Sequence, residues 1–487
     1  MKKNVLALSI TAAVLGFAGS AQAVTAPYGS TADELRLSPN GIGHSLLVPY
    51  FTTQGTNATL INLVNTDTIN GKAVKIRFRS ASNSDDIFDF QVFLSPGDVW
   101  AASVAQGANG RSNLSTNDNS CTKPAKSNLG SGFVTTRLDP TFTDAQKANA
   151  TREGYVEIFN MADVAPTSAL FTAIKHVNSV APCSGAAWTA LDVDAASWPG
   201  LVAPTTGLMG NYSIINLATA AGYGGNVTAI RAVNSTINTN VADNSAAGNV
   251  VYWPQTAALI GAGITNFTAD PLLRGGQVAA SSYDLPDMST PYTAATANPL
   301  VQAGDLSRSI ATTSIKNEFF SDQTVAALTD WVFSMPTRRY SVALDYATNT
   351  RVYSVLPTAY FTAANTAIVN RQICVTGINY AAYDREENSP INPTDVVISP
   401  NVPEAPQAFC GEASVLAINN AAVSGVLKAN VAVRGIDIAY KEGWINIATP
   451  GIAGNGLPVL GEAYVNALAG TSNFGVNWGH RYSRRGL

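Results

Sequence analysis

The 487-residue chain carries 33 acidic and 29 basic residues, a net charge of −4, and only 13% of its residues are charged. A mildly acidic chain without a basic stripe lacks the electrostatic surface that nucleic acids require, so we expect no nucleic-acid partner. Because an average soluble protein has about 25% charged residues, small uncharged polar groups must cover much of this surface. Such a composition slightly favours packing against neighbouring molecules, since fewer charges lose water at a contact.

Residues 1–23 have the three parts of a secretory signal peptide. Two lysines precede an apolar run from Val5 to Ala18, and Ala21-Gln22-Ala23 supplies the small-x-small cleavage sequence. The run is shorter than the about 20 residues of a spanning helix. We therefore expect export, cleavage after residue 23 and no transmembrane segment in the mature chain. Its location would be the cell surface, the outer membrane, the periplasm or the medium.

Strand signals are clearest in the region 24–199. Thr59–Val64 is a short apolar run, and residues 74–79 alternate apolar with basic side chains, which predicts one buried and one wet face. Phe88–Leu94 and Val99–Trp100 follow after polar turns. Short strands at intervals of about 8–12 residues indicate an antiparallel, immunoglobulin-like β-sandwich.

The rest of this first region alternates between loop and regular structure. Residues 105–148 are rich in Asn, Ser, Gly and Thr and predict a long loop held by Cys121. Residues 154–159 predict another strand, and residues 166–176 have a more helical pattern.

The middle region, 200–300, is rich in Ala, Gly, Asn and Thr. Tyr212–Leu217 and Val250–Trp253 predict strands between long surface connections. Asp284–Pro299 is polar, contains proline and is typical of a linker.

The C-terminal region, 301–487, returns to strand patterns. Asn388–Pro406 holds five prolines, too many for regular structure. The whole chain is therefore expected to be mostly β, with sandwich elements, long loops and few short helices. The predicted strands of this region are Trp331–Phe333, Tyr340–Leu344, Val352–Leu356 and Gly443–Ile447.

The mature chain has four cysteines: Cys121, Cys183, Cys374 and Cys410. An even number in an exported chain indicates disulfides, and the sequence has no C-x-x-C pair that would favour a metal site. Three pairings are possible. We favour Cys121–Cys183 and Cys374–Cys410, because each joins partners close in sequence.

The sequence has few patterns typical of catalytic sites, so we favour a protein without enzymatic activity. The sequence has no H-E-x-x-H, no nucleotide-binding glycine fingerprint and no complete nucleophile elbow. His44, His176 and His480 are far apart in sequence and are expected to be ordinary hydrogen-bonding residues. The seven tryptophans have no common spacing, so we expect each to pack in the core.

Two charged clusters have a structural and a functional reading. In Tyr383–Glu387 we expect a solvated turn; the alternatives are a calcium site formed by Asp384, Glu386 and Glu387 with loop carbonyls, or a catalytic carboxylate pair. No other cofactor is expected. The second cluster is near the C-terminus and consists of Arg481, Arg484 and Arg485. We expect these arginines to lie in a solvated tail; the alternative is that they contact an anionic envelope glycan or lipid.

Several spaced motifs resemble, in order, a family of uncharacterised exported proteobacterial proteins described only as cell-surface proteins. The resemblance implies an envelope location and a shared fold across most of the mature chain, and it brings no known activity or site residue. A disulfide between the last two cysteines, Cys374 and Cys410, would fit this resemblance. The motifs are Lys72–Arg79, Leu94–Trp100, Arg152–Ile158, Thr329–Trp331, Pro336–Arg339 and Tyr383–Glu387.

The sequence thus supports three hypotheses. The first is a non-enzymatic, surface-layer-like structural protein of the cell surface, whose partner would be copies of itself. The second is an adhesin-type module that binds a glycan or a protein. The third is a secreted hydrolase with an unfamiliar site, which would need a cleft with two carboxylates or a serine beside a histidine.

Overall fold

The structure is a computed structural model that describes residues 30–193, 195, 197–236, 245–255, 286–290, 292–293, 299–354, 360–387, 407–420, 423–431, 433–470 and 472–484. The predicted signal peptide and the proline-rich segment 388–406 lie outside these residues. Strands make up 46% of the described residues and helices 12%, which confirms the predicted mostly β fold with few short helices.

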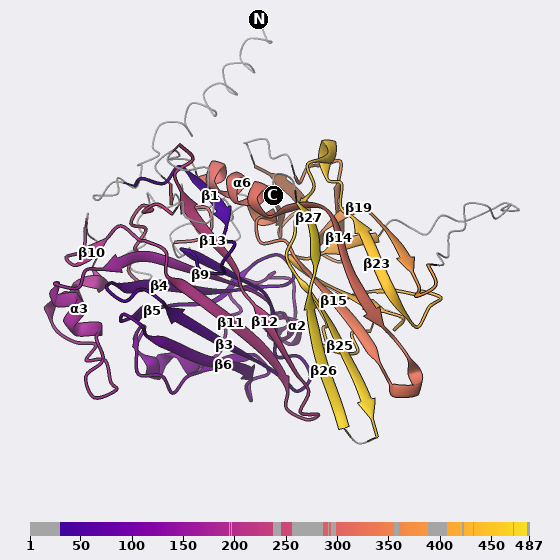
Figure 1. Ribbon diagram of the computed structural model, residues 1–487, viewed down its shortest axis with the longest axis horizontal. Helices are drawn as coiled ribbons and strands as arrows, with labels where there is room; N and C mark the ends of the chain where they lie inside the picture. The colour runs from indigo at the N-terminus through magenta and orange to yellow at the C-terminus, as the bar shows by residue number, and fades with distance from the viewer. Residues whose placement is uncertain are drawn as a thin grey trace, which may run out of the picture.

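Two antiparallel sheets form the first half of the molecule (Figure 1). Its strands are β1 (Glu34–Leu37), β2 (Ser45–Thr52), β3 (Asn57–Asn65), β4 (Gly71–Ser80), β5 (Asp86–Leu94), β6 (Val99–Gln106), β7 (Ser112–Ser115), β8 (Cys121–Lys123), β9 (Glu153–Val164), β10 (Leu201–Val202), β11 (Leu208–Asn216), β12 (Gly222–Asn226) and β13 (Thr228–Val233). Sheet A has the order β1-β13-β2-β9-β4-β5-β8, with β10 beside β9, and sheet B has the order β12-β11-β3-β6-β7. Side chains such as Ile76 of sheet A and Trp100 of sheet B fill one core between them.

A second pair of sheets, antiparallel apart from one parallel pair of strands, forms the other half of the molecule. Its strands are β14 (Ala311–Phe320), β15 (Leu328–Ser334), β18 (Thr366–Val369), β19 (Gln372–Tyr383), β20 (Gln407–Cys410), β21 (Ala413–Ile418), β22 (Val433–Ile436), β23 (Glu442–Ala448), β24 (Leu457–Pro458), β25 (Glu462–Ala469), β26 (Ser472–Gly479) and β27 (Arg481–Arg484). Sheet C has the order β18-β19-β23-β14-β24, with β20 beside β19 and β27 beside β14; sheet D has the order β22-β21-β15-β25-β26. A small hairpin pairs β16 (Val342–Asp345) with β17 (Thr350–Tyr353).

Strands β15 and β21 of sheet D are buried on both faces, so this sheet belongs to both halves of the molecule. In β15, Trp331 lies in the core shared with sheet C, whereas Val332 lies in the core of the first half. The hydroxyls of Tyr464 in β25 and Tyr212 in β11 are 2.5 Å apart. The two halves are therefore packed together through a common sheet rather than joined by a linker.

The edges of sheets B and D also meet, as Figure 1 shows where β12 and β26 lie side by side. The side-chain amide of Asn477 accepts a hydrogen bond from the backbone N–H of Gly224 at 3.0 Å and donates one to its carbonyl at 2.6 Å. Asn477 thus takes the place that a backbone peptide group would occupy in a ladder between the two strands.

The helices are short and lie in the connections. The predicted helix in residues 166–176 is confirmed as α3, but the predicted long loop 105–148 is partly wrong, because it holds β7, β8 and α2.

Within the described residues, no helix is both long and apolar enough to span a membrane. The helices and turns are α2 (Asp144–Ala150), α3 (Ala169–Ile174), α4 (Ala186–Thr189), α6 (Pro299–Ile310), η1 (Lys126–Ser131), η2 (Ala190–Asp192), η6 (Gln323–Val325), η7 (Arg338–Tyr340) and η8 (Ile452–Gly454).

The predicted wet face of β4 is wrong, because Lys75, Arg77 and Arg79 are all fully buried. Segments that come much later in the chain cover them: Lys75 donates to the Gln255 side chain at 2.8 Å, and Arg77 donates to the Pro286 carbonyl at 2.9 Å. Alternation correctly predicted the strand, but it does not tell what covers the polar side.

A buried set of four charged residues, which we call the ionic joint, links sheet A to later segments. Arg79 of β4 pairs with Glu157 of β9 at 3.2 Å, and Arg339 of η7 pairs with Asp287 at 3.2 Å. Arg79 and Asp287 are 3.9 Å apart, and burial raises the pKa of Asp287 to about 6. The predicted linker 284–299 is therefore wrong in its described part, which is packed into the molecule.

Two further strand predictions differ from the structure. Residues 250–253 form no strand, although Val250, Val251 and Tyr252 are buried against sheet A. Tyr340 ends the turn η7 and precedes β16 instead of opening a strand.

Candidate functional site

An open cleft of about 590 Å³ lies at the edge of sheet A, and we call it the edge cleft. Asp86, Phe88 and Asp89 of β5 line it, together with two adjoining walls, the β8 segment with Lys123 and the α4 segment with Trp188. The cleft exists because β8 pairs with β5 only at residues 91–93. Pro124, which follows β8, has no N–H to continue the ladder.

Every carboxylate in the edge cleft has a cation beside it. Asp86 accepts from Arg137 at 2.6 Å, and Asp192 accepts from Lys123 at 2.7 Å. Asp89 accepts from Lys75 beneath it and from the Gln255 amide at 2.6 Å. The cleft therefore presents polar groups whose charges are already compensated.

Two aromatic rings give the edge cleft an apolar side. Phe88 is partly exposed and stacks on Phe133 with ring centroids 4.7 Å apart. Trp188 is also partly exposed; the Lys123 ammonium lies 4.2 Å from its ring centroid, and Phe93 packs against it at 4.9 Å. These contacts hold both rings in fixed positions.

Both favoured disulfides are present. Cys121 is bonded to Cys183 and Cys374 to Cys410, with Cα atoms 5.4 Å and 3.9 Å apart. The first bond lies next to the edge cleft, because Cys121 begins β8 and Cys183 precedes α4. The second joins opposite residues of β19 and β20.

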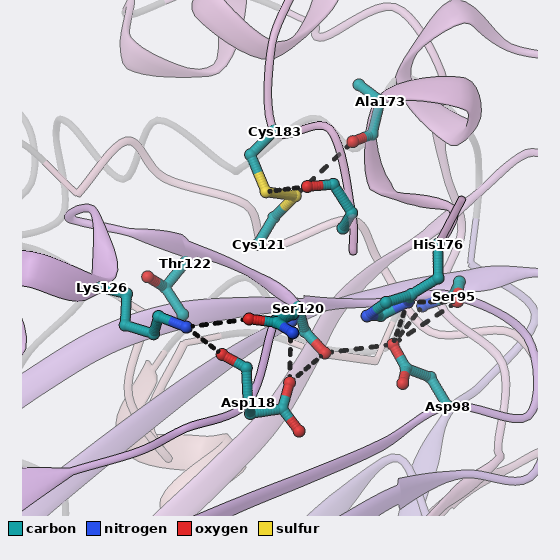
Figure 2. Close-up of a disulfide and its surroundings, with 12 residues drawn as sticks. Ser95, Asp98, Asp118, Ser120, Cys121, Thr122, Lys126, Ala173, His176 and Cys183 are labelled. Carbon is teal, nitrogen blue, oxygen red and sulfur yellow. Dashed lines mark hydrogen bonds and ion pairs between the residues drawn. A yellow bond between two sulfur atoms is a disulfide. The ribbon is translucent and has the colours of Figure 1, made fainter. Parts of the chain in front are cut away.

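Figure 2 shows a polar cluster beside the first disulfide that resembles a serine–histidine–aspartate group in composition. His176 Nδ1 lies 3.4 Å from Ser95 Oγ and 3.5 Å from Asp98 Oδ2. A catalytic serine–histidine–aspartate triad needs the serine hydroxyl at one ring nitrogen of the histidine and the carboxylate at the other. Here both groups contact the same nitrogen, Nδ1. Burial raises the pKa of Asp98. The cluster therefore lacks the geometry of a nucleophilic site.

The other two histidines have separate partners. His44 Nδ1 accepts from the backbone N–H of Ala232, and His480 Nε2 lies 3.0 Å from the Val332 carbonyl. Burial lowers the pKa of each imidazole to about 3, so both remain neutral at ordinary pH. Within the described residues, no three His, Cys, Asp or Glu side chains gather to hold a metal ion.

The two predicted charged clusters lie on the surface of the second half. Glu386 and Glu387 are exposed in a turn after β19, as expected, and Arg385 pairs with Glu442 of β23 at 2.6 Å. The predicted arginine tail is wrong in part, because Arg481–Arg484 form β27 and pair with β14. Arg485 lies outside the described residues.

The tryptophans divide between core and surface. Trp100 and Trp331 are buried as predicted, but the core assignment is wrong for Trp444 and Trp478, which are 39% and 37% exposed. Trp188 in the edge cleft was not distinguished from the others by sequence. The only sequence signal for the cleft was Cys121 with Cys183, since that pair joins its two walls.

No protein-family model matches this chain, and no match was found among curated proteins or solved structures.

Proposed function

We propose that this chain is an exported structural protein of the cell envelope that assembles with copies of itself through the outer face of sheet B. The supporting observation is that this face carries no charged side chain. Its outward positions on β3 are Leu60, Asn62 and Val64, and the outward positions of the neighbouring β6, β7, β11 and β12 are likewise uncharged.

The face combines exposed apolar side chains with side chains that bond to one another. Val64 lies opposite both Val99 and Met209, which are 51% and 39% exposed. Beside them, Asn62 donates to the Asn211 side chain at 2.9 Å. Contiguous exposed apolar side chains of this kind mark interaction sites on soluble proteins.

A second copy is the occupant that fits the charge and area of this face. Two copies of an acidic chain repel each other, so they approach most easily where neither presents a charge. Strand spacing and rise give the face roughly 700 Å², close to the about 800 Å² per partner of a standard interface. Sheet faces also stack readily at about 10 Å.

Export is supported by the two disulfides, which persist in oxidising compartments outside the cytoplasm. The ordered envelope layer that we propose would be made from molecules whose two halves share sheet D. Such a molecule transmits load without bending at a hinge.

The test is to place one charge on this face. Asn211→Arg should convert assemblies into monomers in multi-angle light scattering and abolish a regular layer in electron micrographs of the envelope, because the burial of like charges opposes contact. Thr350→Arg, on the exposed β17, is the matched control and should assemble normally. A wild-type protein that is monomeric and free in the culture medium would contradict the proposal.

A further inference from the structure

We propose that the edge cleft binds a neutral carbohydrate and that the Cys121–Cys183 bond fixes its two walls. This inference is independent of assembly through sheet B. The volume of about 590 Å³ lies within the about 300–1,000 Å³ of small-molecule sites.

The paired charges of the cleft determine the class of ligand. An ionic ligand would have to displace an existing partner, such as Arg137 from Asp86 or Lys123 from Asp192. A hydroxyl group needs no such exchange, because it donates to a carboxylate and accepts from a guanidinium or ammonium at the same time. Neighbouring anion–cation pairs therefore suit a ligand that carries several hydroxyls and no charge.

The aromatic side of the cleft suits the same ligand. Phe88 and Trp188 give partly exposed apolar surface beside the ion pairs, and ligand sites commonly combine such surface with a few fixed polar groups. A sugar ring has C–H groups on its faces and hydroxyls at its rim, so it meets both kinds of surface at once.

The disulfide connects the two walls directly. Cys121 is followed by Thr122 and Lys123 on one wall, and Cys183 comes shortly before Trp188 on the other. Figure 2 shows the bond crossing between these two segments, with Thr122 projecting from the first of them. The bond adds a covalent link to the non-covalent contacts between these walls, which include the Lys123–Asp192 ion pair and the packing of Trp188 on Lys123 and Phe93.

The experiment is isothermal titration calorimetry of the mature chain with cellohexaose, maltohexaose, hexa-N-acetylchitohexaose and the acidic tetragalacturonate. We expect one of the neutral hexasaccharides to bind. Trp188→Ala and the milder Asp192→Asn should each weaken it at least tenfold, whereas Trp444→Ala, at an exposed tryptophan outside the cleft, should leave affinity unchanged. The double variant Cys121→Ser/Cys183→Ser should also weaken binding while its circular dichroism stays β-rich.

Three outcomes would overturn the inference. The first is that none of the neutral hexasaccharides binds, and the second is that tetragalacturonate binds more tightly than all of them. The third is that both cleft variants retain full affinity, whatever the affinity of Trp444→Ala. Full affinity in the folded double cysteine variant would overturn the role of the disulfide. The oligomeric state of Asn211→Arg is measured separately, so failure here is distinct from failure of the proposed assembly.

Discussion

Buried charge is the main residue-level feature of this protein, although few of its residues are charged. Arg79 and Glu157 have no exposed side-chain area, and neither has Asp287. Taking such groups out of water is costly unless each one keeps its partner. Three of the motifs noted in the sequence, 72–79, 152–158 and 336–339, each supply one residue of the ionic joint.

Removal of one partner should therefore be strongly destabilising. We expect Arg79→Met to lower the free energy of unfolding by about 3–5 kcal/mol, because Glu157 would remain buried without its cation. Arg385→Met removes an exposed ion pair and should cost less than about 1 kcal/mol. Urea denaturation measures both, and similar losses in the two variants would contradict this account of the joint.

Asp287 should make stability depend on pH. Burial raises its pKa from 3.8 to about 6, although Arg79, Arg77 and Arg339 face it, and Glu157 opposes its ionisation. Between pH 3.8 and about 6, the folded state therefore keeps a proton on the Asp287 carboxyl that the unfolded chain has lost. This stabilisation is complete below the ordinary pKa and disappears as pH rises through about 6.

The matching variant is Asp287→Asn, which cannot titrate. The melting temperature of the wild type, relative to this variant, should be higher at about pH 4 than at about pH 7. Thermal melts across that range measure the difference, and parallel curves would show that Asp287 does not titrate there.

At the scale of elements, alternation predicted the strands that have one face in a core. The apolar run at residues 59–64 lies within β3, and Phe88–Leu94 lies within β5. The short edge strands β7, β8 and β27 were missed; β8 and β27 pair with strands that come earlier in the chain and are not their immediate neighbours, so no local pattern indicates them. Residues 250–253 show the converse: an apolar run without a neighbouring strand packs as irregular chain.

The edge cleft was harder to predict than the strands for the same reason. Its residues come from separate segments around positions 86–89, 122–137 and 188–192, and no local pattern relates them. Only the favoured pairing of Cys121 with Cys183 indicated that two of these segments are neighbours.

The two disulfides should contribute almost equally to stability. They join residues 62 and 36 positions apart, and the chain-entropy relation gives each about 4 kcal/mol, with the longer loop ahead by only about 0.5 kcal/mol. Paired Cys→Ser variants compared by chemical denaturation measure both. A melting temperature that is the same with and without reductant would contradict a stabilising role.

At the scale of the whole molecule, sheet D replaces the usual domain boundary. Val332 and Tyr464 lie in the core of the first half, while Trp331 of the same sheet lies in the core of the second. Separation of the halves would expose one face of this sheet. Most multi-domain chains unfold in steps, but here neither half keeps a complete core without the other.

We therefore expect a single cooperative thermal transition for the described body. Calorimetry should give equal calorimetric and van't Hoff enthalpies, and a fragment ending at residue 236 should not fold. Two resolved transitions, or a folded fragment with dispersed amide resonances, would show that the halves are independent.

The position of Tyr464 in the sequence has a consequence for how the chain matures. Tyr464 and its strand β25 complete a core whose first-half strands were made more than two hundred residues earlier. During synthesis, the early strands keep an exposed apolar end until the late strands have been made. During this interval the nascent protein most needs a chaperone. A chain truncated by a nonsense mutation shortly before β25 would never complete this core and would be recognised as unfolded.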